Sequence, residues 1–177
     1  STFVMDEGIH APSAPTQPDL HVPLEPDAGR DRLVPWRRAP FPAPWSAWFA
    51  RTAPLHLEVG FGDGRYTVRR ALEHPGEDFV GIEVSSVSVR RALTKVRANG
   101  LDNVRLIKAG AQIVTRQLFG PSSLSTVTVN FPDPWPKDRH EDHRLLRVPY
   151  LRLLADRLVP QGEVRLATDH PEYLAFS

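Results

Sequence analysis

Residues 55–64 read Leu-His-Leu-Glu-Val-Gly-Phe-Gly-Asp-Gly, and this stretch decides the fold class. The short apolar run that ends in glycine predicts a buried strand over residues 55–61. The glycines allow a sharp turn into a helix that is predicted over residues 64–73. Their spacing is G-x-G-x-G with Glu58 two residues before the first glycine, and it differs from the G-x-G-x-x-G fingerprint of dinucleotide sites.

Strands and helices alternate through the rest of the chain. Further strands are predicted over residues 78–84, 103–110, 125–131 and 163–169, and further helices over residues 85–100, 111–119 and 142–159. Strands that alternate with helices of this length form right-handed βαβ units. The sequence therefore predicts an α/β fold that is Rossmann-like, with a mostly parallel sheet and helices on both faces.

The chain before residue 55 differs in composition from the rest. Ten of the 18 prolines fall in residues 1–54, which predicts a Pro-rich N-terminal arm that is partly irregular. Residues 55–177 are predicted to form the domain itself. Arginines mix with aromatic residues over 30–51, and such a mixture can bind a nucleic-acid backbone. We favour instead a short amphipathic helix over residues 45–50 that caps the core.

The overall composition excludes several classes of protein. The chain has 177 residues, 41% of them hydrophobic and 24% charged, as is typical of one globular domain. The absence of cysteine excludes a disulfide scaffold, a thiolate zinc site and a cysteine nucleophile. A net charge of +1 argues against a protein that holds nucleic acid by bulk charge alone. No apolar run is long enough for a membrane span and no signal peptide is apparent, so we expect a cytoplasmic protein.

Two acidic residues mark the ends of the first two predicted strands. A carboxylate at Glu58 would attract the ammonium group of S-adenosylmethionine and repel the pyrophosphate of NAD, so the turn favours the first cofactor. Glu83 ends the second predicted strand, where a carboxylate can accept hydrogen bonds from both ribose hydroxyls of a nucleoside. The plainer alternatives are a structural glycine turn with a solvated Glu58, and a helix cap at Glu83.

A stiff, polar loop follows the fourth predicted strand. Residues 130–137 read Asn-Phe-Pro-Asp-Pro-Trp-Pro-Lys, and the three prolines restrict the backbone and remove amide donors. Trp135 offers a flat face for stacking, and Asp133 is expected where the methyl group of the cofactor projects. The alternative is a rigid connecting loop with a surface tryptophan, but such loops are uncommon as mere connectors at the carboxyl end of a strand.

Four motifs in this order and spacing resemble one family. EVGFGDG (58–64), GIEV (81–84), NFPDPWPKDRH (130–140) and ATDHPEY (167–173) are similar to motifs of the tRNA (guanine-N7-)-methyltransferases, which are class I S-adenosylmethionine-dependent enzymes. The resemblance implies transfer of a methyl group from S-adenosyl-L-methionine to N7 of a variable-loop guanine (guanine 46) in tRNA.

The resemblance also implies the residues of the site. Asp133 corresponds to the proposed catalytic aspartate of the family. The implied cofactor-binding residues are Glu58, Gly60, Gly62, Glu83, Val84, Gly110, Ala111 and Asn130. The implied substrate-binding residues are Asp133, Lys137, Arg139, His140 and Asp169. The implied partner is tRNA, with no membrane and no metal, and no obligatory protein partner is inferred.

Three features depart from the family pattern. Gly110 has no side chain where the family carries an acidic or amide residue near the adenine, and Glu141 and Asp142 interrupt the basic run that usually follows His140. The C-terminal strand pair of the superfamily is expected to be missing from this chain. Two alternative functions therefore stay open: a non-catalytic RNA-binding or scaffold subunit that keeps the fold, and an exocyclic-amine nucleic-acid methyltransferase.

Overall fold

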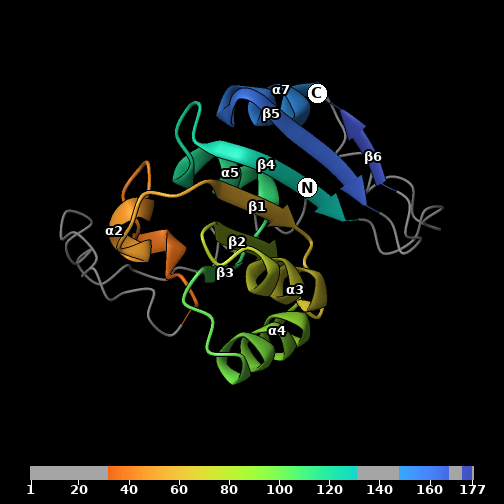
Figure 1. The fold of residues 1–177 in the computed structure, drawn as a ribbon. Coiled ribbons are helices and arrows are strands. Elements are labelled where there is room, and N and C mark those ends of the chain that lie inside the picture. The colour runs from red at the N-terminus through yellow and green to blue at the C-terminus, as the bar shows by residue number, and fades with distance from the viewer. Residues whose placement is uncertain (1–31, 131–147, 168–172, 177) are drawn as a thin grey trace, which may run out of the picture.

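The computed structural model describes residues 32–130, 148–167 and 173–176, which contain one six-stranded sheet (Figure 1). The strands are β1 (Leu55–Val59), β2 (Asp78–Glu83), β3 (Val104–Lys108), β4 (Leu124–Asn130), β5 (Leu158–Ala167) and β6 (Tyr173–Phe176). They lie in the order β3-β2-β1-β4-β5-β6. The first five are parallel and β6 pairs antiparallel with β5, so the predicted Rossmann-like α/β fold is confirmed.

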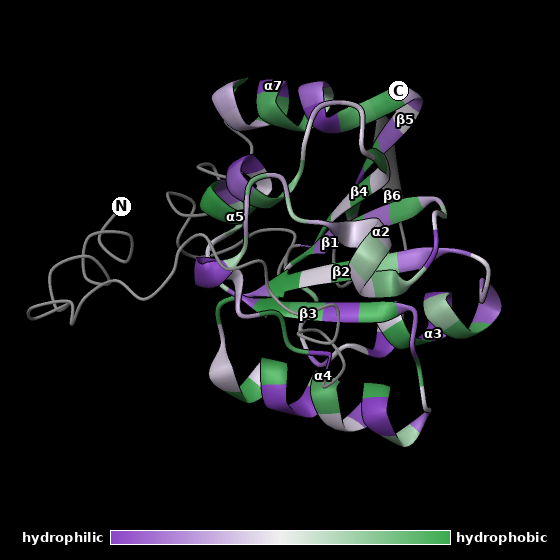
Figure 2. Cartoon of the chain, turned by 90° about the vertical axis from the view of Figure 1, so that its left-hand side faces the viewer, coloured by the Kyte–Doolittle hydropathy of each residue, from purple (hydrophilic) through white to green (hydrophobic). Residues whose placement is uncertain are grey.

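Helices cover both faces of this sheet, as predicted. They are α3 (Arg65–Glu73) and α4 (Ser86–Ala98) on one face, and α2 (Trp45–Phe49), α5 (Ala111–Leu118) and α7 (Val148–Arg157) on the other. Figure 2 shows α4 and α7 on opposite sides of the strands. Because both faces are covered, strand residues are buried on both sides: Leu57 and Val80 lie in the core on the α5 side and Leu106 in the core on the α3 side, each 1% exposed or less.

Part of the N-terminal arm packs into the same core. Trp45, Trp48 and Phe49 of α2 are buried, which confirms the predicted core-capping helix. The indole of Trp45 stacks on Phe119 with 5.0 Å between ring centroids, and its Nε1 donates to the carbonyl of Leu118 at 2.9 Å. The domain boundary predicted at residue 54 stays a prediction, but the described residues before it contribute to the main core.

Helix α7 and strand β5 differ in their bounds from the sequence-based expectation. The helix predicted to residue 159 ends at Arg157, and β5 begins at Leu158, before the predicted turn. The backbone amides of Ser122 and Ser123 bond the last carbonyls of α7, at Asp156 and Arg157, and so end the helix there. The pairing of β4 with β5 then shifts register near Gln161, which has a φ of 68°.

The C-terminal strand pair was expected to be missing, and the described residues contain one strand beyond β5, which that expectation did not include. β6 (Tyr173–Phe176) pairs with residues 164–167 of β5. A run of four residues is too short for periodicity to identify as a strand, and it is the exposed edge of β5 that supplies its hydrogen-bond partners.

Among the described helices, none is long and apolar enough to cross a membrane.

Candidate functional site

The turn after β1 contains Gly60, Gly62 and Gly64. At these positions it presents backbone atoms, and not side chains, at the carboxyl end of the sheet. Gly60 has a φ of +75°, and its amide donates to the carbonyl of Ile82 at 2.7 Å. A Cβ atom at Gly60 would lie 3.1 Å from the carbonyl oxygen of Asn130, so the ends of β1 and β4 approach closely only because this residue is glycine. A Cβ atom at Gly62 would meet no described atom within 4 Å, which leaves the turn open to a ligand there.

Glu58 lies at the centre of a buried polar cluster beneath this turn. Its side chain is 6% exposed, and each carboxylate oxygen accepts one hydrogen bond from a neutral donor. Thr67 Oγ1 of α3 donates to Oε1, and Asn130 Nδ2 at the end of β4 donates to Oε2 at 2.6 Å. Burial raises the pKa of the Glu58 carboxyl, although these hydrogen bonds and the nearby Arg70 partly offset the rise. The alternative of a solvated Glu58 is therefore wrong.

Glu83 ends β2, directly beside β1. Its Oε2 accepts hydrogen bonds from the backbone amides of Val84 at 2.6 Å and Ser85 at 3.0 Å. Its Oε1 accepts no hydrogen bond from the residues that the structure describes. The N-cap of α4 is Ser85, whose Oγ accepts from the amide of Ser88 at 3.2 Å. Glu83 is thus held in place by one oxygen while the other can accept hydrogen bonds from a ligand.

The residues after β2 and β3 complete this edge of the sheet. Val84 is 61% exposed, so its side chain is open to contact with a ligand. Gly110 is the N-cap of α5 with φ −71° and ψ 139°, an extended conformation that any residue can adopt. Ala111 begins α5. The amide of Ala109 donates to the carbonyl of Glu83 at 3.1 Å, which ties the end of β3 to the end of β2.

The predicted site residues divide into two groups. Glu58 and Asn130 are hydrogen-bonded, Gly60 follows Glu58 at the end of β1, and Glu83 lies on the adjacent strand, where Val59 pairs with Ile82. Predicted residues that fall outside the described parts of the chain are Asp133, Lys137, Arg139, His140 and Asp169. Their roles stay predictions. Asn130 is the last described residue before Asp133 in the sequence, so the contacts of Glu58 extend to the end of β4.

Two residues that matter to the site were missed by sequence analysis. Thr67 is buried in the first turns of α3 and donates to Glu58, but a threonine inside a helical pattern gives no signal of its own. Gly81 lies inside β2, and a Cβ atom there would lie 2.6 Å from Cδ2 of Phe61, the buried residue between the first two glycines of the turn. A glycine within a strand does signal such a close approach.

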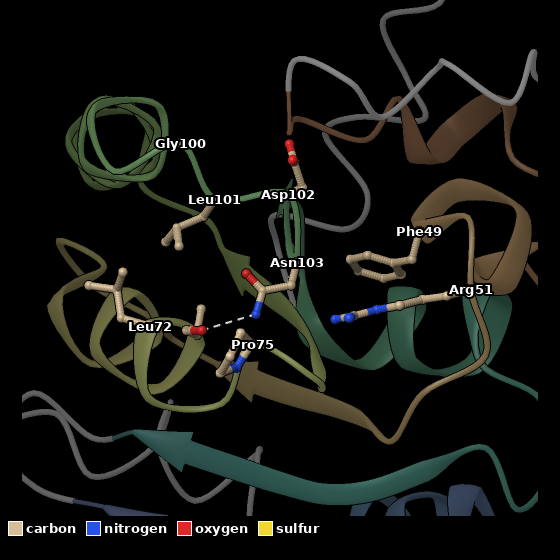
Figure 3. Close-up of a pocket in the computed structure, with 9 residues that line it drawn as sticks. Phe49, Arg51, Leu72, Pro75, Gly100, Leu101, Asp102 and Asn103 are labelled. Atoms are coloured by element: carbon tan, nitrogen blue, oxygen red, sulfur yellow. Dashed lines mark hydrogen bonds between the residues drawn. The ribbon is translucent and has the colours of Figure 1, made fainter.

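A pocket of about 350 Å³ lies at the opposite, amino end of the strands (Figure 3). Its polar lining groups are already bonded to the protein. Asn103 Nδ2 donates to the carbonyl of Ala71 at 3.1 Å and to that of Glu77 at 3.0 Å. Arg51 Nη2 pairs with Asp78 Oδ1 at 2.7 Å. This pocket therefore offers a ligand fewer unsatisfied polar groups than the carboxyl end does.

Comparison with known proteins identifies the family to which this chain belongs. A sequence profile of the family described as "Putative methyltransferase" matches residues 52–177. The tRNA (guanine-N(7)-)-methyltransferase of Thermus thermophilus is 46% identical over 145 residues, which are 82% of this chain and 47% of that protein. The chain belongs to the tRNA (guanine-N7-)-methyltransferase family.

Other members and more distant structures extend this result. The family member from Mycolicibacterium paratuberculosis is 40% identical over 156 residues, which are 88% of this chain and 58% of that protein. The chain spans about half the length of the curated relatives it matches. The crystal structure of TrmN from Thermus thermophilus has a TM-score of 0.54 at 22% identity, covering 67% of this chain and 34% of that one. An antibiotic-related methyltransferase has a TM-score of 0.53 at 17% identity, covering 70% and 62%. These two likenesses concern the fold alone.

Proposed function

We propose that this chain transfers a methyl group from S-adenosyl-L-methionine to N7 of a variable-loop guanine in tRNA. The observation that carries the proposal is the pair of carboxylates, Glu58 and Glu83, at adjacent strand ends beside an open glycine turn. The relatives named tRNA (guanine-N(7)-)-methyltransferase, at 40–46% identity, support the choice of reaction and substrate.

The described residues fit this cofactor by their chemistry. Glu83 Oε1 would accept hydrogen bonds from the ribose hydroxyls, while Oε2 stays bonded to the backbone. Val84 would pack against the adenine. The buried Glu58 carboxylate, which is paired with no cation among the described residues, favours a positively charged ligand at the turn. A pyrophosphate would be repelled by the same two carboxylates.

The reaction requires the protein mainly to position the methyl donor and the guanine base. When bound, S-adenosylmethionine would supply an electrophilic methyl group that guanine N7 attacks with an in-plane lone pair, and the carbon–sulfur bond would break to release S-adenosylhomocysteine. N7 carries no proton, so no general base is required, and the residues act by orienting the base and excluding water. We propose that Asp133 accepts hydrogen bonds from N1–H and the amino group of guanine, and that its charge favours the positive charge that develops on the base. Lys137, Arg139, His140 and Asp169 are proposed to contact the tRNA.

The experiment is methyl transfer to a defined RNA. The purified chain is incubated with S-adenosylmethionine and an unmodified tRNA transcript, and the digested nucleosides are analysed by mass spectrometry. We expect N7-methylguanosine from the normal transcript and none from a transcript that carries 7-deazaguanosine at the variable-loop position. Methylation that persists on the 7-deaza transcript would identify another acceptor atom, such as an exocyclic amine, and would contradict the proposal.

Asp133→Asn tests the proposed role of the carboxylate. Asparagine is nearly isosteric but directs an amide donor at the donors of guanine, so we expect a fall in the single-turnover rate of about 10²-fold or more. Affinity for S-adenosylmethionine, measured by calorimetry, is expected to stay unchanged. Recovery of the variant at high pH would mean that a proton is removed during the reaction, which attack by N7 does not require.

A further inference from the structure

Two segments that are distant in sequence carry only basic charges, and each contributes residues to the β3 edge of the sheet. Residues 32–57 and 103–132 contain no Asp or Glu, and together they contain seven Lys and Arg residues. Several of these are used inside the fold: Arg32 pairs with Asp102, Arg51 pairs with Asp78, and Arg105 is buried against backbone carbonyls. Arg37, Arg38 and Lys108 are exposed on the surface, and Arg37 also makes contacts within the protein, one of them with the Trp36 ring.

The structure fixes where these three cations lie. Residues 32–34 extend the sheet beside β3: the amide of Leu106 donates to the carbonyl of Arg32 at 2.6 Å, and the amide of Val34 donates to the carbonyl of Leu106 at 2.9 Å. The bridge is parallel, so the chain runs toward the carboxyl end of β3 as it enters η1 (Trp36–Arg38). There the indole Nε1 of Trp36 donates to the carbonyl of Lys108 at 3.2 Å.

This anchor places η1 next to the candidate cofactor site. Lys108 is the last residue of β3, and the amide of the next residue, Ala109, bonds the carbonyl of Glu83 at 3.1 Å. The guanidinium of Arg37 lies over the Trp36 ring, 5.3 Å from its centroid. Trp36 also packs against the core on the α5 side, so the turn is held both by an apolar contact and by a hydrogen bond.

We propose that Arg37, Arg38 and Lys108 form a phosphate-binding surface for the RNA strand that carries the target base. The occupant is RNA because the surface is cationic and lies at the carboxyl end of the sheet, beside the proposed cofactor site at Glu83. Trp36 is the residue that positions the surface. The proposal rests on the proposed function for the direction of approach, but it assigns binding to residues that the resemblance to the family does not include.

The test compares two double variants, each of which replaces two arginines that are adjacent in the sequence. Arg37→Gln/Arg38→Gln removes two charges from the surface, and Arg90→Gln/Arg91→Gln removes two exposed charges from α4, on the other face of the sheet. Affinity for an unmodified tRNA transcript is measured at several salt concentrations with the full chain. For the first pair we expect a loss of about tenfold near physiological salt and a smaller salt slope, by roughly 0.7–0.9 for each phosphate contact removed. The second pair is expected to bind like the wild type.

Two further measurements separate RNA contact from structural damage. Affinity for S-adenosylmethionine should be unchanged in Arg37→Gln/Arg38→Gln, because neither side chain belongs to the cofactor site. Trp36→Phe keeps the apolar packing but loses the Nε1 donor, and it should weaken tRNA binding without changing the number of cations and hence the salt slope. An unchanged slope in Arg37→Gln/Arg38→Gln, or an equal loss in the α4 pair, would overturn the proposed surface.

The outcomes also distinguish this proposal from the proposed function. If the wild-type chain binds tRNA through Arg37 and Arg38 but methylates an atom other than N7, the surface stands and the proposed reaction fails. If it methylates N7 while Arg37→Gln/Arg38→Gln keeps its full salt slope, the reaction stands and the surface fails. A wild-type chain with no salt-dependent affinity for tRNA would overturn both.

Discussion

Polar side chains are buried at both ends of the sheet, but their hydrogen-bonding groups find partners of different kinds at the two ends. At the amino end, His56 of β1 is 5% exposed, and both of its ring nitrogens are bonded, Nε2 to Glu77 Oε1 at 2.8 Å and Nδ1 to Thr126 Oγ1 at 2.7 Å. The Glu77 carboxylate can only accept, so Nε2 carries the proton and Nδ1 accepts from the Thr126 hydroxyl. Burial lowers the pKa of His56, which agrees with this neutral form.

At the carboxyl end, Glu58 lies two residues further along the same strand in a different environment. Its two hydrogen bonds come from the neutral groups of Thr67 and Asn130, and among the described residues it forms no ion pair. The amino end thus completes its polar contacts within the protein and gains stability. The carboxyl end buries a carboxylate without a paired cation, which costs stability and favours a cationic ligand.

His56→Ala should give the largest effect, and it should act on stability alone. The variant loses the stacking of the imidazole on Phe79, whose centroid is 4.9 Å away, and leaves Thr126 without its partner. We expect a loss of about 3 kcal/mol in the free energy of unfolding, measured by urea denaturation. S-adenosylmethionine affinity of the folded protein should not change.

The matched control is His74→Ala. The more exposed His74 pairs with the same Glu77, so its replacement should lower the free energy of unfolding by less than about 1 kcal/mol. Equal losses in the two variants would contradict the comparison.

Glu58→Gln should show the reverse pattern. Glutamine can accept from Asn130 and donate to the Thr67 hydroxyl, so both contacts are kept while the buried charge is removed. We expect S-adenosylmethionine to bind at least about tenfold more weakly by calorimetry, because a charge-assisted contact is lost. The free energy of unfolding at neutral pH should be equal to that of the wild type or higher. A marked loss of stability with unchanged cofactor affinity would make Glu58 a structural residue like His56.

The pH dependence of stability should separate the two ends further. The folded-state pKa values of His56 and Glu77 are lowered, His56 by burial and Glu77 by the hydrogen bond from His56. The contribution of His56 is therefore present above pH 6.5 and that of Glu77 above pH 4.5, and each is lost as pH falls through the folded-state pKa. The pKa of Glu58 is raised by burial, so its contribution is present below pH 4.5 and is lost as pH rises. Acid should therefore weaken the wild type, and it should weaken Glu58→Gln more steeply because the opposing contribution is gone. Parallel pH curves for the two proteins would contradict this assignment.

Gly110→Asp should give the smallest effect and should strengthen the carboxyl end. The extended backbone at the N-cap of α5 accepts an aspartate without strain, and its side chain can cap the helix, a gain of a few tenths of a kcal/mol. It also restores the acidic residue that the family pattern places near the adenine, so we expect S-adenosylmethionine to bind about threefold more tightly. Gly110→Ala is the control, because it adds a side chain without an acceptor. Equal affinities for the two variants would remove residue 110 from the adenine contact.

The sequence by itself determined the order of the elements and indicated the end of the sheet at which we propose the site. Alternating apolar runs and helical segments predicted the parallel strands, and the glycine turn after Glu58 marked the carboxyl end of β1. The aromatic spacing over residues 45–50 predicted the core-capping helix. Each of these signals is local, since it depends on periodicity or on the backbone freedom of a few neighbouring residues.

Only the tertiary structure decided which side chains meet. Glu58 and Asn130 are 72 residues apart, as are Trp36 and Lys108, and no local pattern links either pair. Their contacts follow from β4 lying beside β1, and from residues 32–34 extending the sheet at its β3 edge. The same is true of β6, which becomes a strand because the edge of β5 supplies its partners. Strand order and edge pairing depend on packing over the whole sheet, so the environment of each carboxylate is a property of the fold and not of the motif that contains it.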